Sequence, residues 1–105
     1  MSDTLARLEA TIASRKGGDP KSSYVASLFA NGRPKIARKL GEEAVEAIVA
    51  SLAEDKADLT GEAADILFHL MVLLADAGVP LADVLAELER REGTSGHDEK
   101  ASRTA

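Results

Sequence analysis

The stretch that decides the fold of this chain is residues 34–52, PKIARKLGEEAVEAIVASL. It is rich in alanine, leucine and glutamate, which favour helix, and a helix tolerates proline at its first position, where the N–H has no intrahelical partner. One apolar stripe follows helical spacing and consists of Ile36, Leu40, Ala44, Ile48 and Leu52. The stretch therefore predicts a long amphipathic helix.

Upstream of this helix, two shorter helices are separated by clear breakers. Apolar side chains recur at helical spacing over residues 5–12 and stop at Gly17-Gly18. A second short helix is predicted over residues 24–29, ending at Asn31-Gly32. Residues 19–23, DPKSS, form a turn that can cap it.

Downstream, residues 54–56 are a polar break, and either Asp55 or the region of Thr60 could cap the next helix. That helix contains the most apolar run of the chain, residues 66–75, and ends at Gly78 before Pro80. A final amphipathic helix follows from residue 81 to the arginines at 90–91. Residues 93–105 are small and polar, and we expect a disordered tail there.

Length and composition exclude several classes of protein. A chain of 105 residues corresponds to one domain, and only 3% aromatic residues argues against a β-sandwich or barrel. The net charge of −5 argues against binding to nucleic acid, and the lack of cysteine excludes disulfides and thiolate sites. No signal peptide and no span of about 20 apolar residues is visible. We expect a cytoplasmic all-α bundle of about five helices over residues 1–92, with no membrane partner.

The acidic residues form two groups at helical spacing. Glu42, Glu43 and Glu46 give the run E-E-x-x-E, and Glu62 and Asp65 give E-x-x-D after fifteen intervening residues. Each residue advances a helix by about 100°, so each group lies on one side of its helix, the first opposite the apolar stripe. If the two helices pack antiparallel, the two groups can face each other.

Two interpretations of these acidic residues stay open. Acidic runs on helices are usually solvated faces, and like charges at these spacings repel. Two acidic faces packed together would be costly without a cation, whereas Mg²⁺ binds carboxylate oxygens and keeps positions for water and phosphate. The matched pair of groups favours a metal site in the bundle.

Basic residues precede the first acidic group, namely Arg33, Lys35, Arg38 and Lys39. They can form ion pairs with the acids one turn away, or they can bind phosphate groups next to a metal. His69 continues the acidic stripe on an otherwise apolar helix. A lone histidine there is more often a hydrogen-bonded core residue than a metal ligand.

These motifs resemble a known family. The segments are DPKSSY at 19–24, IARKLGEEAVE at 36–46, EAAD at 62–65 and FHL at 68–70. Together they resemble the phosphoribosyl-ATP pyrophosphohydrolase family, one of the all-α nucleoside triphosphate pyrophosphohydrolases (the MazG-like group). The resemblance covers about residues 5–92. It implies a cytoplasmic, Mg²⁺-dependent enzyme, typically a homodimer or larger, that acts at the second step of histidine biosynthesis.

The resemblance also implies a reaction and roles for residues. Phosphoribosyl-ATP would be hydrolysed between its α- and β-phosphates to phosphoribosyl-AMP and pyrophosphate. The implied metal ligands are Glu43, Glu46, Glu62 and Asp65, with Glu42 beside them. Glu42 or Glu43 would orient or deprotonate the attacking water. Lys39 would bind phosphate, assisted by Lys35 or Arg33, while Ser23 and Tyr24 would lie near the substrate.

Two alternatives lead to different experiments. A housekeeping (deoxy)nucleoside triphosphate pyrophosphohydrolase would share the metal site and differ in its base and sugar pocket; the DPKSSY segment favours phosphoribosyl-ATP instead. A non-catalytic helical dimerisation module would explain the helices and leave the matched acidic groups as coincidence. Such a module should not change its stability with millimolar Mg²⁺.

Overall fold

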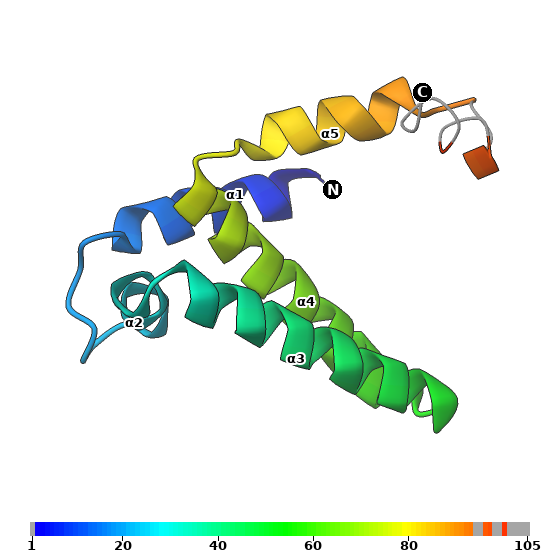
Figure 1. Cartoon of the computed structure of the whole chain (residues 1–105), viewed down its shortest axis with the longest axis horizontal. Coiled ribbons are helices and arrows are strands. Elements are labelled where there is room, and N and C mark those ends of the chain that lie inside the picture. Colours follow the sequence, from blue (N-terminus) through cyan, green and yellow to red (C-terminus); the bar gives the residue numbers. More distant parts are fainter. Residues whose placement is uncertain (1, 94–95, 98–99, 101–105) are drawn as a thin grey trace.

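Five helices make up the fold in the computed structural model, which describes residues 2–93, 96–97 and 100 (Figure 1). They are α1 (Ser2–Arg15), α2 (Tyr24–Asn31), α3 (Arg33–Leu52), α4 (Lys56–Ala77) and α5 (Leu81–Arg90). The described residues contain no strand. The expected all-α fold of about five helices is therefore confirmed.

The predicted helix boundaries have local causes in the structure. The Ser23 side chain caps α2 by accepting a hydrogen bond from the N–H of Ala26 at 3.1 Å. Asp55 caps α4 through the N–H of Asp58 at 3.0 Å, which decides between the two caps that the sequence left open. Gly78 ends α4 with a φ of +74°, a left-handed conformation that glycine adopts without strain.

An antiparallel hairpin of α3 and α4 forms the long axis of the molecule. Figure 1 shows the two helices side by side, with the end near residues 52–56 projecting away from the other three helices. At the opposite end, α1 and α2 pack against the hairpin around a small core. The buried members of this core are Ile12, Leu28, Ile36, Met71, Val72 and Leu81.

The apolar stripe expected on α3 is buried only in its first half. Ile36 is fully buried, but Ile48 is 58% exposed and Leu52 is 80% exposed. The second half of the stripe stays exposed because α3 turns Glu43 and Ala50 toward the interior instead. The exposed side chains, which we name the α3 apolar face, are Val45, Ile48, Val49 and Leu52.

The chain is elongated for its length. Its radius of gyration is 15.8 Å, whereas a compact domain of this size has about 13 Å. The projecting half of the hairpin contributes to this shape, as does α5, which extends away from the hairpin (Figure 1). That half has neighbours on few sides and exposes the α3 apolar face.

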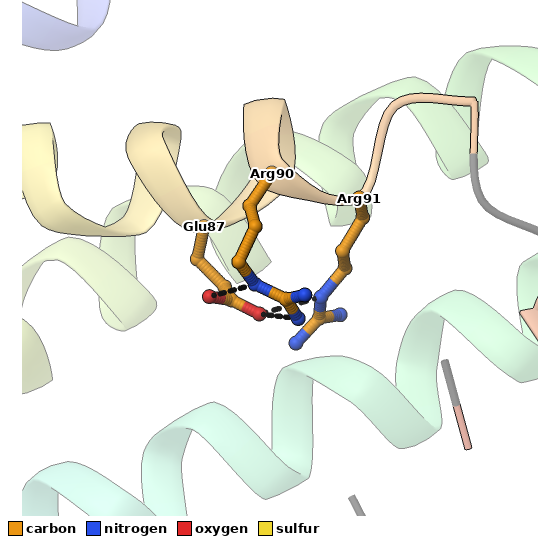
Figure 2. Close-up of polar contacts among 3 residues, drawn as sticks. All are labelled: Glu87, Arg90 and Arg91. Atoms are coloured by element: carbon orange, nitrogen blue, oxygen red, sulfur yellow. Dashed lines mark hydrogen bonds and ion pairs between the residues drawn. The ribbon is translucent and has the colours of Figure 1, made fainter. Parts of the chain in front are cut away.

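Helix α5 is anchored at its start and linked by ion pairs at its end. The Glu9 carboxylate of α1 accepts a hydrogen bond from the N–H of Leu81 at 2.7 Å and so serves as a cap that Pro80 cannot provide. Figure 2 shows the side chains of Arg90 and Arg91 both contacting the Glu87 carboxylate, at 2.7 and 2.9 Å to the same oxygen. The hydrogen bonds of Arg90 and then Arg91 lower the pKa of Glu87 to about 2.

The predicted tail, residues 93–105, lies for the most part outside the described residues. Within the described part of the chain, no single helix is long and apolar enough to cross a membrane. Helices α4 and α5 reach that length and composition only when taken together across a bend of 110°.

Candidate active site

Three carboxylates meet between α3 and α4. Glu43 of α3 and Glu62 and Asp65 of α4 each contribute one oxygen, and these three oxygens lie within 4.8 Å of one another. Positions three apart on a helix share a face, which explains why Glu62 and Asp65 point the same way. The antiparallel hairpin brings Glu43 opposite them. We name these three residues the acid cluster.

The acid cluster contains two buried oxygens that lack a hydrogen-bond donor. Oε2 of Glu43 and Oε2 of Glu62 are buried and find no partner among the described residues. Buried polar atoms in proteins are nearly always paired, so two unpaired acceptors side by side are unusual. Such oxygen-only donors are the ligands that a hard divalent cation binds, and the residues present therefore fit a metal ion.

The electrostatics of the cluster agree with this conclusion. Desolvation, followed by the neighbouring carboxylates of Glu46 and Glu43, raises the pKa of Glu62 to about 7. Desolvation and then Glu46 also raise the pKa of Glu43. Without a cation, a bound proton removes one of the negative charges that would otherwise repel each other in the cluster. A metal ion would take the place of that proton.

The two other predicted acids differ in position. Glu46 affects the pKa of both Glu43 and Glu62, so its carboxylate borders the cluster. Glu42 turns away and pairs with Lys39 at 3.5 Å and with Arg38 at 3.9 Å. The expectation that Glu42, Glu43 and Glu46 share one side of the helix is therefore wrong for Glu42, which lies on the exposed flank.

The predicted phosphate-binding residues are spread along α3. Lys39 lies near the cluster, and its pKa is raised by Tyr24 first and then by Glu42. Lys35 is one turn earlier and half-buried. Arg33 starts the helix, about 15 Å along its axis from Glu43. Its guanidinium binds the Asp76 carboxylate at 2.8 Å and the Asp76 carbonyl at 3.0 Å.

The two predicted substrate-side residues begin α2. The Ser23 hydroxyl already accepts the capping N–H of Ala26. Tyr24 is half exposed, and its hydroxyl lies 3.1 Å from Nε2 of His69. The interpretation of His69 as a hydrogen-bonded core residue is confirmed, since it is 5% exposed.

The contact between Tyr24 and His69 was missing from the sequence-based site. The only signal was the spacing of His69 four residues after Asp65, which continues the acidic stripe. Its partner Tyr24 is 45 residues away, beyond the reach of any helical pattern. The pair joins α2 to the part of α4 that carries the acid cluster.

Comparisons with a family model and with individual known proteins all identify the same family. The family model described as phosphoribosyl-ATP pyrophosphohydrolase matches residues 5–92. A phosphoribosyl-ATP pyrophosphatase of Rhizorhabdus wittichii is 69% identical over 103 residues, covering 98% of this chain and 97% of the relative. A protein of the same name from Dinoroseobacter shibae is 66% identical over 99 residues, covering 94% of this chain and 97% of that protein. The sequence-based expectation is thus confirmed: the chain belongs to the phosphoribosyl-ATP pyrophosphohydrolase family, a family of hydrolases.

Proposed function

We propose that this chain hydrolyses phosphoribosyl-ATP between its α- and β-phosphates, giving phosphoribosyl-AMP and pyrophosphate in histidine biosynthesis. The observation that carries the proposal is the pair of buried, unpaired oxygens of Glu43 and Glu62, which lie beside Asp65. A polyphosphate substrate needs positive charge next to such acids, and Mg²⁺ is the cation that pairs carboxylates with phosphates most often. Family membership supports the choice of substrate.

We assign Mg²⁺ to Glu43, Glu46, Glu62 and Asp65. When bound, Mg²⁺ supplies charge to the phosphate oxygens and lowers the pKa of a bound water. The two unpaired oxygens would bind the ion directly, while Glu46 borders both of these side chains. Glu42 or Glu43 would orient the attacking water. Glu42 is suited to this role because its exposed carboxylate lies outside the acid cluster and is not needed to bind the metal.

The basic residues would bind the phosphate chain. Lys39 is the most suitable of these residues, because it lies beside Glu42 and Tyr24 next to the cluster. Lys35, one turn away, could bind the leaving pyrophosphate. Arg33 would have to exchange Asp76 for a phosphate. Ser23 and Tyr24 would border the substrate from the start of α2.

A substrate panel tests the reaction. We expect pyrophosphate release from phosphoribosyl-ATP in the presence of Mg²⁺, and much slower release from dCTP, dUTP and ATP. A preference for a common nucleotide would favour the housekeeping alternative. No release from any nucleotide, together with no effect of Mg²⁺ on stability, would favour a non-catalytic module.

Matched variants test the assignment of the metal site. Glu62→Gln and Glu46→Gln keep the side-chain shape and remove the charge, so each should lose most of the activity while retaining its helical circular dichroism. Glu89→Gln is the control, because this exposed glutamate lies on α5 away from the hairpin. Wild-type turnover in either site variant would contradict the assignment.

We also propose a homodimer in which the α3 apolar face of one chain packs on that of a second copy. Four exposed apolar side chains at positions 45, 48, 49 and 52 line one side of a helix that projects from the molecule. Contiguous exposed apolar patches on soluble proteins mark association sites, and two such hairpins can form a four-helix bundle. A two-fold axis makes the same face serve both chains.

The proposed catalytic domain is residues 1–92, and residues 93–105 are a dispensable tail. The family match ends at residue 92, which supports this boundary. We propose a cytoplasmic location, since the substrate is a charged metabolite of amino-acid biosynthesis.

A further inference from the structure

Tyr24, Phe68 and His69 form an aromatic cluster beside the acid cluster. The rings of Tyr24 and Phe68 stack with centroids 6.1 Å apart, and His69 meets Phe68 edge-on at 5.0 Å. The chain has one tyrosine, two phenylalanines and no tryptophan, so two of its three such residues gather here. Tyr24 is nevertheless 52% exposed, so its ring is held in place by its neighbours and still open to a ligand.

The hydrogen bonds of His69 determine which of its nitrogens carries a proton. Nδ1 lies 2.8 Å from the backbone carbonyl of Asp65, which can only accept, so Nδ1 carries the hydrogen. The imidazole is buried, and both of its hydrogen-bond partners, a backbone carbonyl and a phenol, are uncharged. In the tautomer that carries its hydrogen on Nδ1, Nε2 is an acceptor.

The orientation of the Tyr24 hydroxyl follows from this tautomer. Nε2 of His69 lacks a hydrogen, so the bond of 3.1 Å between the two residues is donated by the phenol. The phenol has only one hydrogen, and its oxygen therefore has only lone pairs left for other partners. Phosphate oxygens are acceptors as well and cannot bind these lone pairs.

We propose that His69 is a positioning residue that holds Tyr24 as a hydrogen-bond acceptor, so that Tyr24 binds a hydroxyl or amino group of the nucleotide and not a phosphate. Lys39, which the proposed function assigns to phosphate, lies near Tyr24 and pairs with Glu42 at 3.5 Å, so it provides positive charge in the same site. The two residues would then bind different groups of the nucleotide, the lysine anionic oxygens and the tyrosine neutral hydrogen-bond donors. His69 belongs to α4, the helix that carries Glu62 and Asp65, and its bond to the Asp65 carbonyl fixes the imidazole ring on that helix.

A nuclear magnetic resonance experiment tests the tautomer without any assay of activity. The chain has two histidines, so His97→Ala leaves His69 as the single imidazole. Long-range ¹H–¹⁵N spectra should show a protonated Nδ1 and an acceptor Nε2 in the folded protein. Tyr24→Phe should change the ¹⁵N shift of Nε2 and leave that of Nδ1 nearly unchanged. A ring protonated at Nε2, or an Nε2 shift indifferent to Tyr24→Phe, would overturn the proposal.

Kinetics of three variants test the positioning role. Tyr24→Phe should raise KM for phosphoribosyl-ATP about 3- to 10-fold, the loss of one neutral hydrogen bond, with a smaller change in kcat. In His69→Asn, the asparagine amide can take over the hydrogen bond of Nδ1 but cannot reach Tyr24. This variant should therefore show a similar rise in KM. His69→Gln can place an oxygen near the position of Nε2, so it should recover part of the wild-type KM.

The double variant tests whether the two residues act together. Tyr24→Phe combined with His69→Asn should raise KM no more than either change alone, because both remove the same contact. If the KM increases of the two single variants multiply in the double variant, the proposal is overturned. An unchanged KM in Tyr24→Phe would also overturn it. Tyr24 is half exposed, so this variant is informative even if the His69 variants fold poorly.

Inhibition by Mg²⁺ complexes of ATP, 2′-deoxy-ATP and ITP identifies the donor. If the donor is a ribose hydroxyl, the wild type should prefer ATP over 2′-deoxy-ATP, and Tyr24→Phe should lose that preference. If it is the amino group, the preference for ATP over ITP should be lost instead. Preferences that are absent in the wild type or unchanged in Tyr24→Phe overturn the proposal. The inference rests on the proposed function, whose own failure would appear separately as a lack of pyrophosphate release by the wild type.

Discussion

Replacing Ile48 by lysine should dissociate the proposed dimer. Fully burying an isoleucine contributes about 1.5–3 kcal/mol. Ile48 is 58% exposed in the single chain, so burial of the exposed part contributes about 1–2 kcal/mol. Because the dimer has two-fold symmetry, the substitution occurs twice in the interface, and the loss of dimerisation free energy is about 2–4 kcal/mol. This corresponds to a dimer that is about 30- to 1,000-fold weaker.

Sedimentation velocity over a dilution series measures this change. The wild type should sediment at about twice the chain mass of 11.0 kDa at micromolar concentration, and Ile48→Lys should shift to the chain mass over the same range. Leu88→Lys is the matched control, because Leu88 is 56% exposed but lies on α5 outside the α3 apolar face. Circular dichroism should show unchanged helix content in both variants.

Two results would refute the reasoning. A wild type that sediments as an 11.0 kDa species at micromolar concentration would show that the chain does not form the proposed dimer. An Ile48→Lys variant that dimerises as tightly as the wild type would show that the α3 apolar face is not the interface. If Leu88→Lys dissociates the dimer instead, the interface lies on α5.

Five further outcomes are expected. Saturating Mg²⁺ at 100 times its dissociation constant should add about 2.7 kcal/mol to the free energy of unfolding, seen as a rise in melting temperature that EDTA reverses. The pKa of Glu62 is raised from 4.5 to about 7, so the metal-free protein should lose stability as pH rises between these values, and Glu62→Gln should flatten that slope. Below pH 7 the apparent Mg²⁺ affinity of the wild type should fall, because the ion must displace this proton. Glu9→Ala should cost about 1–2 kcal/mol in urea unfolding by removing the cap on Leu81, and Glu9→Gln should cost less. Deletion of residues 94–105 should leave turnover and oligomer mass unchanged.

The metal-site hypothesis followed from local rules, and so did most of the helix boundaries. Gly78 and Pro80 ended α4 as predicted, and Pro34 stands in the first turn of α3. The spacing of Glu62 and Asp65 is by itself enough to predict that both carboxylates lie on one helical face. These features depend on neighbours within about one helical turn, and such rules can be read directly from a sequence.

Only the tertiary structure decided which side of α3 faces inward. That helix is apolar on two sides, and periodicity alone placed Ile48 in the apolar stripe and Glu43 on the side opposite it. Packing against α4 decides which of these sides is buried, since the hairpin places Glu43 opposite Glu62 and Asp65 and leaves Ile48 exposed. The rotation of a helix about its own axis depends on its neighbours in space, and a single chain's pattern does not contain them.

Two contacts could not be predicted from the sequence, because they also depend on which elements are neighbours in space. Arg33 binds Asp76 across 43 residues, and Tyr24 meets His69 across 45. Helical spacing determined that His69 continues the stripe of Asp65, but only the docking of α2 on α4 brought a phenol to its second nitrogen. Local chemistry therefore determined the helices and the acidic groups, while long-range packing determined which groups meet, because such contacts form only between elements already placed in space.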